Sequence, residues 1–145
     1  MQSFPHHYTV AAAADADGDV SLSGEKLAPI PAAPPAEFGG PGGRWSPETL
    51  LVASVASCFI LSFRAIARAS KLPWTSLNTE VEGTLERRDG QTLFTQFTVR
   101  AKLHLPEGAN KERAHRILEK AEETCLITNS LSSETHLEAA IVDQS

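Results

Sequence analysis

Apolar and polar residues alternate along two neighbouring segments in the second half of the chain. The segments are Thr75–Glu86 and Thr92–Leu105, and Arg88-Asp89-Gly90 between them has the residues of a tight hairpin turn. A shorter alternation over His136–Val142 predicts a final strand. Near the N-terminus, a weaker pattern over Tyr8–Glu25 predicts a second hairpin. We therefore expect β-structure in both halves of the chain.

Two segments have helical patterns. Ser46-Pro47-Glu48 is typical of a helix start, with serine as N-cap and proline at the first helical position, and the predicted helix runs to about Ser70. Its residues from Leu50 to Leu61 are apolar or small on every side, so we expect this half to be buried all round. The second helix, from Lys111 to about Cys125, is amphipathic, and Leu126–Ser133 has room for a short third one.

The order of these elements predicts the fold class. The segment Pro29–Pro47 is rich in proline and glycine, which resist both helix and central strand, so we expect an ordered loop that covers a pocket or a partner. The chain then has a hairpin, this loop, a buried helix, a second hairpin, an amphipathic helix and a strand. This order predicts an α+β fold with an antiparallel sheet, in one domain over residues 1–145.

Composition narrows the function. The chain has 145 residues and a formal net charge of −5, which argues against nucleic acid and anionic membranes as partners. The apolar stretch Leu50–Leu61 falls short of the roughly 20 residues that cross a bilayer, so no membrane span is predicted. The N-terminus lacks the basic and apolar regions of a secretory signal, and we expect a cytoplasmic protein.

The two cysteines are the residues most suited to chemistry. Cys58 lies in the apolar part of the first helix, where a free cysteine is often a packing residue. Cys125 lies where a helix gives way to short polar side chains. Their separation of 67 positions neither supports nor excludes contact between them. The five histidines show no metal-ligand spacing and the glycines of 39–43 no phosphate-loop motif, so we expect no metal and no cofactor.

Two motifs resemble those of a known family. Ser46-Pro47-Glu48-Thr49-Leu50-Leu51, followed by Ala53–Phe59 with Cys58, is similar to the signature helix of the OsmC/Ohr family of osmotically inducible and organic-hydroperoxide-resistance proteins. Ala121–Leu126, followed by Asn129-Ser130, is similar to the family's second cysteine segment. The resemblance extends in element order over roughly Val20–Val142.

This resemblance implies a cysteine-based peroxidase. Cys58 matches the peroxidatic cysteine and Cys125 the resolving cysteine, so the pair is expected to cycle through a disulfide while it reduces organic hydroperoxides, with hydrogen peroxide left open as a second substrate. A dithiol must then reset the pair, and in the organic-hydroperoxide branch this is a lipoyl-bearing protein. The family also implies an intertwined homodimer with long buried central helices, covering sheets and active sites at the subunit interface. A largely apolar helix in so short a chain favours a dimer independently.

Glu48 and Arg44 complete the candidate site. Glu48 matches the family's active-site glutamate, which holds an arginine against the reactive thiol, although a helix-start anion explains it equally well. Along one helix Glu48 and Cys58 would be about 15 Å apart and roughly 80° out of phase, so any link needs a bridging group, a bend or the other subunit. The segment aligned with the family arginine, Ala36-Glu37-Phe38, carries an acid instead, which suggests a divergent branch. Arg44 is the nearest replacement, or a solvated loop residue.

A second function stays open at this point. The same scaffold could serve as a dimeric binding protein in which both cysteines are core residues and no turnover occurs. Thiol titration before and after one equivalent of cumene hydroperoxide separates the two, because only the peroxidase loses two thiols rapidly.

Overall fold

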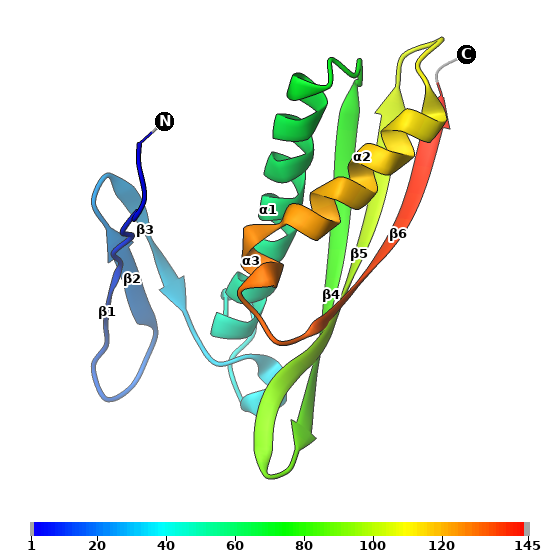
Figure 1. The fold of residues 1–145 in the computed structure, drawn as a ribbon. Helices are drawn as coiled ribbons and strands as arrows, with labels where there is room; N and C mark the ends of the chain where they lie inside the picture. The colour runs from blue at the N-terminus through cyan, green and yellow to red at the C-terminus, as the bar shows by residue number, and fades with distance from the viewer. Residues whose placement is uncertain (1, 144–145) are drawn as a thin grey trace. The chain divides into compact units, whose positions relative to one another are not determined.

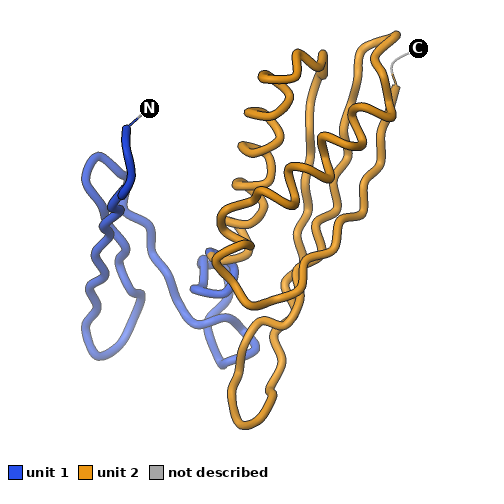
Figure 2. Tube along the Cα trace, viewed as in Figure 1, with its two compact units in different colours: residues 1–50 blue, residues 51–145 orange. Residues whose placement is uncertain are grey.

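The computed structural model describes residues 2–143. The chain divides into two compact units, residues 1–50 and residues 51–145, which Figure 2 shows in different colours. Helix α1, Pro47–Ala69, begins in the first unit and continues into the second. The single domain expected over residues 1–145 stays a prediction.

The first unit contains a three-stranded antiparallel sheet in the order β1-β2-β3 (Figure 1). Its strands are β1 (Ala11–Ala13), β2 (Val20–Gly24) and β3 (Leu27–Ala32). The pairing of β1 with β2 confirms the N-terminal hairpin. Strand β3 was not expected, because it contains Pro29 and Pro31; it lies at the edge of the sheet, where a missing N–H is tolerated. A short 3-10 turn, η1 (Ala36–Phe38), follows.

Helix α1 starts where the sequence predicts. The Ser46 hydroxyl accepts a hydrogen bond from the Thr49 N–H at 3.1 Å, and the Thr49 hydroxyl accepts one from the Ser46 N–H at 2.8 Å. This reciprocal cap satisfies two backbone donors that a helix start leaves open. Ser46 is 2% exposed, so its N–H would otherwise be buried without a partner.

The second unit contains the sheet β4-β5-β6, with β4 (Ser76–Arg88), β5 (Gln91–Leu105) and β6 (Glu134–Asp143). The predicted hairpin is confirmed, and its turn residues Asp89 and Gly90 have φ angles of 51° and 80°, as in a type I′ turn. Strand β6 pairs with β5 in parallel, so the expectation of a purely antiparallel sheet is wrong. Parallel pairing requires a crossover, and α2 (Lys111–Thr124) with α3 (Leu126–Asn129) supplies it.

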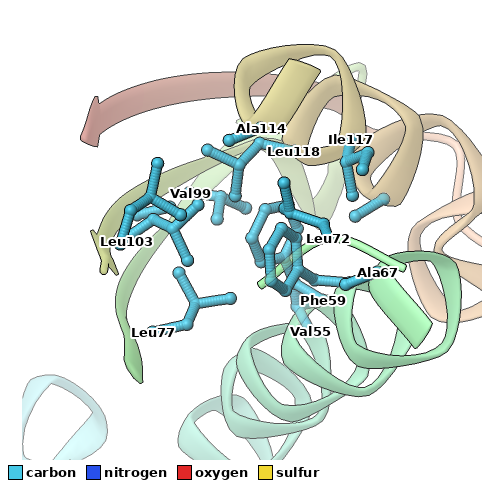
Figure 3. Close-up of a cluster of buried hydrophobic side chains, with 14 of the residues drawn as sticks. Val55, Phe59, Ala67, Leu72, Leu77, Val99, Leu103, Ala114, Ile117 and Leu118 are labelled. Atoms are coloured by element: carbon cyan, nitrogen blue, oxygen red, sulfur yellow. The ribbon is translucent and has the colours of Figure 1, made fainter. Parts of the chain in front are cut away.

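The core of this unit lies between the sheet and helices α1 and α2, which cover the same face (Figure 1). Figure 3 shows how Phe59 of α1, Leu118 of α2 and Val99 of β5 point into it. The amphipathic face predicted for α2 is confirmed. Its buried residues are Ala114, Ile117, Leu118 and Ala121, and those of α1 are Val55, Phe59, Phe63 and Ala67.

Helix α1 buries only one face, so the expectation that its first half is buried all round is wrong for a single chain. Its buried residues recur every four positions, which is the stripe that faces the core. Ser57 is exposed, and Leu61 is 56% exposed. One sheet and one neighbouring helix cover one side of a helix, and the opposite apolar side stays open.

The length argument against a membrane span does not hold for α1. The helix has 23 residues and a mean hydropathy of 2.1 over its best 18-residue window, so it is long and apolar enough by composition to cross a membrane. A single helix of this kind is weak support for a span, because the core helix of a soluble protein meets the same criterion. Its buried stripe packs against the core described above.

Candidate active site

The fold brings the two cysteines together. Cys58 lies at the middle of α1 and is partly exposed. Cys125 is 2% exposed and lies at the junction of α2 and α3, where it ends one helix and begins the next. Both are free thiols, and the Cys125 side chain lies close enough to the Cys58 sulfur to shift its pKa. The structure thus supplies the proximity that the sequence left open.

Short polar side chains hold the junction that carries Cys125. The Thr128 hydroxyl donates to the Cys125 carbonyl at 3.2 Å, and the Asn129 side-chain amide donates to the Glu123 carbonyl at 3.1 Å. The Asn129 N–H also donates to the Cys125 carbonyl at 3.0 Å. These bonds satisfy carbonyl groups at the end of α2 and fix the turn into α3. The polar residues after Cys125 therefore have a structural role in placing its sulfur.

The surroundings of Cys58 favour its thiolate. Burial raises the pKa of the Cys58 thiol, but hydrogen bonds from the Ile127 and Leu126 backbone amides and from the Cys125 side chain outweigh it. Ser62 adds a hydroxyl 3.9 Å from the Cys58 sulfur. The net result is a pKa below the ordinary value for a thiol. A thiolate is the nucleophilic form of cysteine, so Cys58 is the more reactive of the pair near neutral pH.

The pKa of the Cys125 thiol shifts in the opposite direction. Burial raises the pKa of the Cys125 thiol, hydrogen bonds from Thr128 oppose this effect, and the neighbouring Cys58 raises the pKa further. Two thiolates in contact repel each other, so the pair loses one proton well before the second. The Cys58 thiol therefore ionises at a lower pH than the Cys125 thiol.

Glu48 and Arg44 lie in the other compact unit. One carboxylate oxygen of Glu48, Oε1, is buried and has no hydrogen-bond partner among residues 2–143. Glu48 also contributes to the wall of an otherwise apolar cavity of about 510 Å³. The prolines and Phe38 of the predicted loop line the same cavity, which agrees with the expectation that this loop covers a pocket.

Arg44 forms an ion pair within the first unit. Its Nε donates to Asp19 Oδ2 at 2.9 Å, and about half of its side chain is exposed at 47%. Arg44 therefore bonds Asp19 rather than Glu48 in the described chain. Its predicted activating role stays a prediction.

Sequence reasoning missed three contributors to the site, two backbone amides and one side chain. The backbone amides of Leu126 and Ile127 act through the conformation of the α2–α3 junction, which residue types alone do not specify. Ser62 lies one turn after Cys58 on the same side of α1, a spacing that could have been noted. Within residues 2–143, no group of three or more histidine, cysteine or acidic side chains is arranged to hold a metal ion.

Comparisons with known proteins identify a family and related folds. A model of the OsmC-like protein family matches residues 40–140, a range that includes both cysteines. An uncharacterized protein of Bacillus subtilis, YmaD, is 29% identical over 112 residues, covering 74% of this chain and 75% of that protein. An OsmC-like protein of unknown function from Vibrio cholerae has a similar structure, with a TM-score of 0.85, 19% identity, and 94% and 100% of the two chains covered. An organic hydroperoxide resistance protein from Legionella pneumophila aligns with a TM-score of 0.75, 23% identity, and 97% and 99% coverage.

Proposed function

The chain belongs to the OsmC-like protein family, and from this membership we propose that it is a two-cysteine thiol peroxidase acting on organic hydroperoxides. The observation that carries the proposal is the contact between Cys58 and Cys125 at the α2–α3 junction. Cysteines that serve only to fill a core have no reason to lie together with their pKa values shifted in opposite directions.

The proposed cycle begins at Cys58. Its thiolate attacks one peroxide oxygen, the O–O bond breaks, and the alkoxide takes a proton and leaves as an alcohol. Cys58 is then a sulfenic acid. The Cys125 thiol attacks the Cys58 sulfur, the S–O bond breaks, water leaves and a disulfide forms. An external dithiol supplies two electrons and two protons to return both thiols.

Apolar side chains around the sulfur support an organic substrate. Leu126, whose backbone amide reaches Cys58, is 65% exposed, and Ile127 beside it is partly buried. A substrate with an alkyl or aryl group can cover this surface and remove it from water, whereas hydrogen peroxide cannot. We therefore propose organic hydroperoxides as the preferred substrates.

The open face of α1 supports a homodimer. Ser57 and Leu61 are exposed on it, and a second copy of the chain would bury this side. In the proposed dimer the active sites lie at the interface, so a cation from one subunit can reach the unpaired Glu48 oxygen. The dithiol requirement also supports a reducing compartment, and we propose the cytoplasm.

Thiol titration tests the proposal directly. Reduced protein should lose two thiols on addition of one equivalent of cumene hydroperoxide. Cys58→Ser should consume no peroxide, while Cys125→Ser should undergo the first oxidation but lose turnover, with Cys58 found as sulfenic or higher acids by mass spectrometry. Retention of both thiols in the parent protein would reject the peroxidase and favour a binding protein on the same scaffold.

Arg44→Ala tests the proposed replacement for the family arginine. If Arg44 leaves Asp19 to activate Cys58, its removal should slow peroxide attack at least tenfold, or about 1.4 kcal/mol in barrier, and raise the pH at which Cys58 reacts. Asp19→Asn is the matched control, because it breaks the same ion pair while keeping Arg44. An unchanged rate and pH profile in Arg44→Ala would make Arg44 a loop residue without a catalytic role.

A further inference from the structure

A cationic groove lies between α1 and α2, in the same unit as the two cysteines. Its volume is about 360 Å³. Helix α1 contributes Ile66 and Ser70, and α2 contributes Arg113, Arg116, Ile117 and Lys120. Ile117 is 6% exposed and Ile66 partly buried, so the two isoleucines give the groove an apolar base. The three cationic side chains line the same groove.

None of the three cations has an anionic partner within residues 2–143. Arg113 lies in the first turn of α2, beside Glu112, at the helix end where the dipole disfavours positive charge. The last turn of α2 instead carries the acidic residues Glu122 and Glu123, and no basic residue. The charges of Arg113, Glu122 and Glu123 therefore oppose the helix dipole, and Arg116 and Lys120 add two further cations that form no ion pair in the described residues.

The groove lies within reach of the cysteine pair. Cys58, Ser62, Ile66 and Ser70 follow one another at four-residue intervals along α1. Ile66 is therefore about 12 Å from Cys58 along the helix axis. A protein interface of ordinary size covers about 800 Å² on each partner, which is enough to span the groove and the disulfide together.

We propose that this groove docks an acidic surface of the protein that supplies the dithiol. This inference rests on the proposed function, because it concerns the step that regenerates the thiols. The docked donor attacks the more exposed sulfur, that of Cys58, and Cys125 is released as a thiolate that takes a proton. The donor's second thiol then breaks the mixed disulfide, so the donor is oxidised and both cysteines are reduced.

The spacing of the cations favours a protein over a smaller anion. Arg113 and Lys120 are seven residues apart, or about 10 Å along α2, with Arg116 between them. One carboxylate can pair with only part of this row, whereas several acidic side chains on a protein surface can pair with all of it. The chain as a whole carries a charge of −5, so an acidic partner is attracted at this groove and repelled elsewhere.

Two synthetic peptides provide the probe. Each carries a Cys-Gly-Gly-Cys dithiol followed by a tail of four glutamates or, in its twin, four glutamines. An extended tail of four residues spans about 13 Å, which matches the distance from Cys58 to the groove. The Cys58–Cys125 disulfide is formed with diamide, a two-electron thiol oxidant, so the measurement does not depend on peroxide activity. The rate of disulfide reduction is followed by quenching and mass spectrometry.

The variant Arg113→Gln/Arg116→Gln/Lys120→Gln removes the three charges. Its matched control is Arg87→Gln/Arg88→Gln/Lys102→Gln, which removes three charges from exposed positions on β4 and β5. Dithiothreitol, an uncharged small dithiol, should reduce all three proteins at equal rates. Circular dichroism checks that each variant folds, and the peptide comparison on the parent protein stands without either variant.

The glutamate peptide should reduce the parent protein at least tenfold faster than its glutamine twin at low ionic strength. This advantage should disappear in 0.5 M salt and in the groove variant, and should persist in the control variant. Equal rates for the two peptides, or an equal loss in the control, would overturn the docking surface. If diamide oxidises the pair but peroxide does not, the proposed function fails while the docking test stands. Failure of diamide to form the disulfide would overturn both.

Discussion

Gly83→Ala tests how closely α1 must approach the sheet. Gly83 lies in β4 opposite Phe97 of β5. A Cβ at this position would lie 2.9 Å from Val52 Cγ2 and 3.0 Å from a ring carbon of each of Phe94 and Phe97. Carbon atoms in contact are normally at least 3.5 Å apart, so the methyl group cannot enter unless its neighbours move.

Two effects of opposite sign determine how much Gly83→Ala changes the free energy of unfolding. Replacing a strand glycine with alanine stabilises the fold by about 0.5–1 kcal/mol, because the unfolded chain loses freedom. Overpacking costs about 1–3 kcal/mol. The upper part of that range applies here, because Phe97 is fully buried and stacks on Phe94 with centroids 5.2 Å apart, so the Phe97 ring has no open space to move into. We expect a net loss of about 1–2 kcal/mol in the free energy of unfolding, or roughly 2–8 °C in Tm.

Urea denaturation followed by circular dichroism measures this loss, and Val52→Ala provides the control. Val52→Ala removes the nearest clashing atom. The loss in free energy of unfolding caused by Gly83→Ala should therefore be smaller in the Val52→Ala protein than in the parent protein, by at least about 0.5 kcal/mol. Disulfide formation should also slow in Gly83→Ala, since moving α1 off the sheet shifts Cys58 relative to Cys125. An unchanged or raised midpoint, with no coupling to Val52, would refute the packing argument.

Two further predictions concern the thiols and the core. Site-resolved iodoacetamide labelling of the reduced protein should reach its half-maximal rate at a pH below the ordinary thiol pKa for Cys58 and above it for Cys125. The reason is that hydrogen bonds lower the Cys58 pKa in spite of burial, whereas burial raises the Cys125 pKa. Equal pH profiles for the two cysteines would contradict the site. Leu118→Ala should cost about 2–5 kcal/mol by urea denaturation because Leu118 is fully buried, while Leu27→Ala, at a position 60% exposed, should cost far less; a loss below 1 kcal/mol at Leu118 would contradict the core assignment.

Local patterns predicted local structure well in this chain. Asp89-Gly90 specified the turn of the long hairpin because few residues accept two successive positive φ angles. Ser46 and Pro47 specified the start of α1 because their chemistry matches the open donors of a helix end. In both cases the determining interaction lies within four residues of chain.

The errors concern relations between distant segments. The alternation of His136–Val142 is the same for a parallel and an antiparallel strand, and only the crossover through α2 sets the direction of β6. Burial of α1 on every side was inferred from its composition, whereas the number of covering elements in one chain decides it. Contact between Cys58 and Cys125 depends on the packing of α1 against the α2–α3 junction, which a separation of 67 positions does not encode.

The prolines of β3 have a consequence for the solubility of the chain. The Ala33 N–H donates to the Trp45 carbonyl on the side of β3 away from β2. Backbone N–H groups alternate sides along a strand. An N–H at residue 29 or 31 would therefore point to the same outer edge as that of Ala33. Pro29 and Pro31 have no N–H to offer there. A strand from another molecule therefore meets no outward backbone N–H donor at Pro29 or Pro31. The absence of these donors disfavours edge-to-edge aggregation along the β3 edge of the sheet.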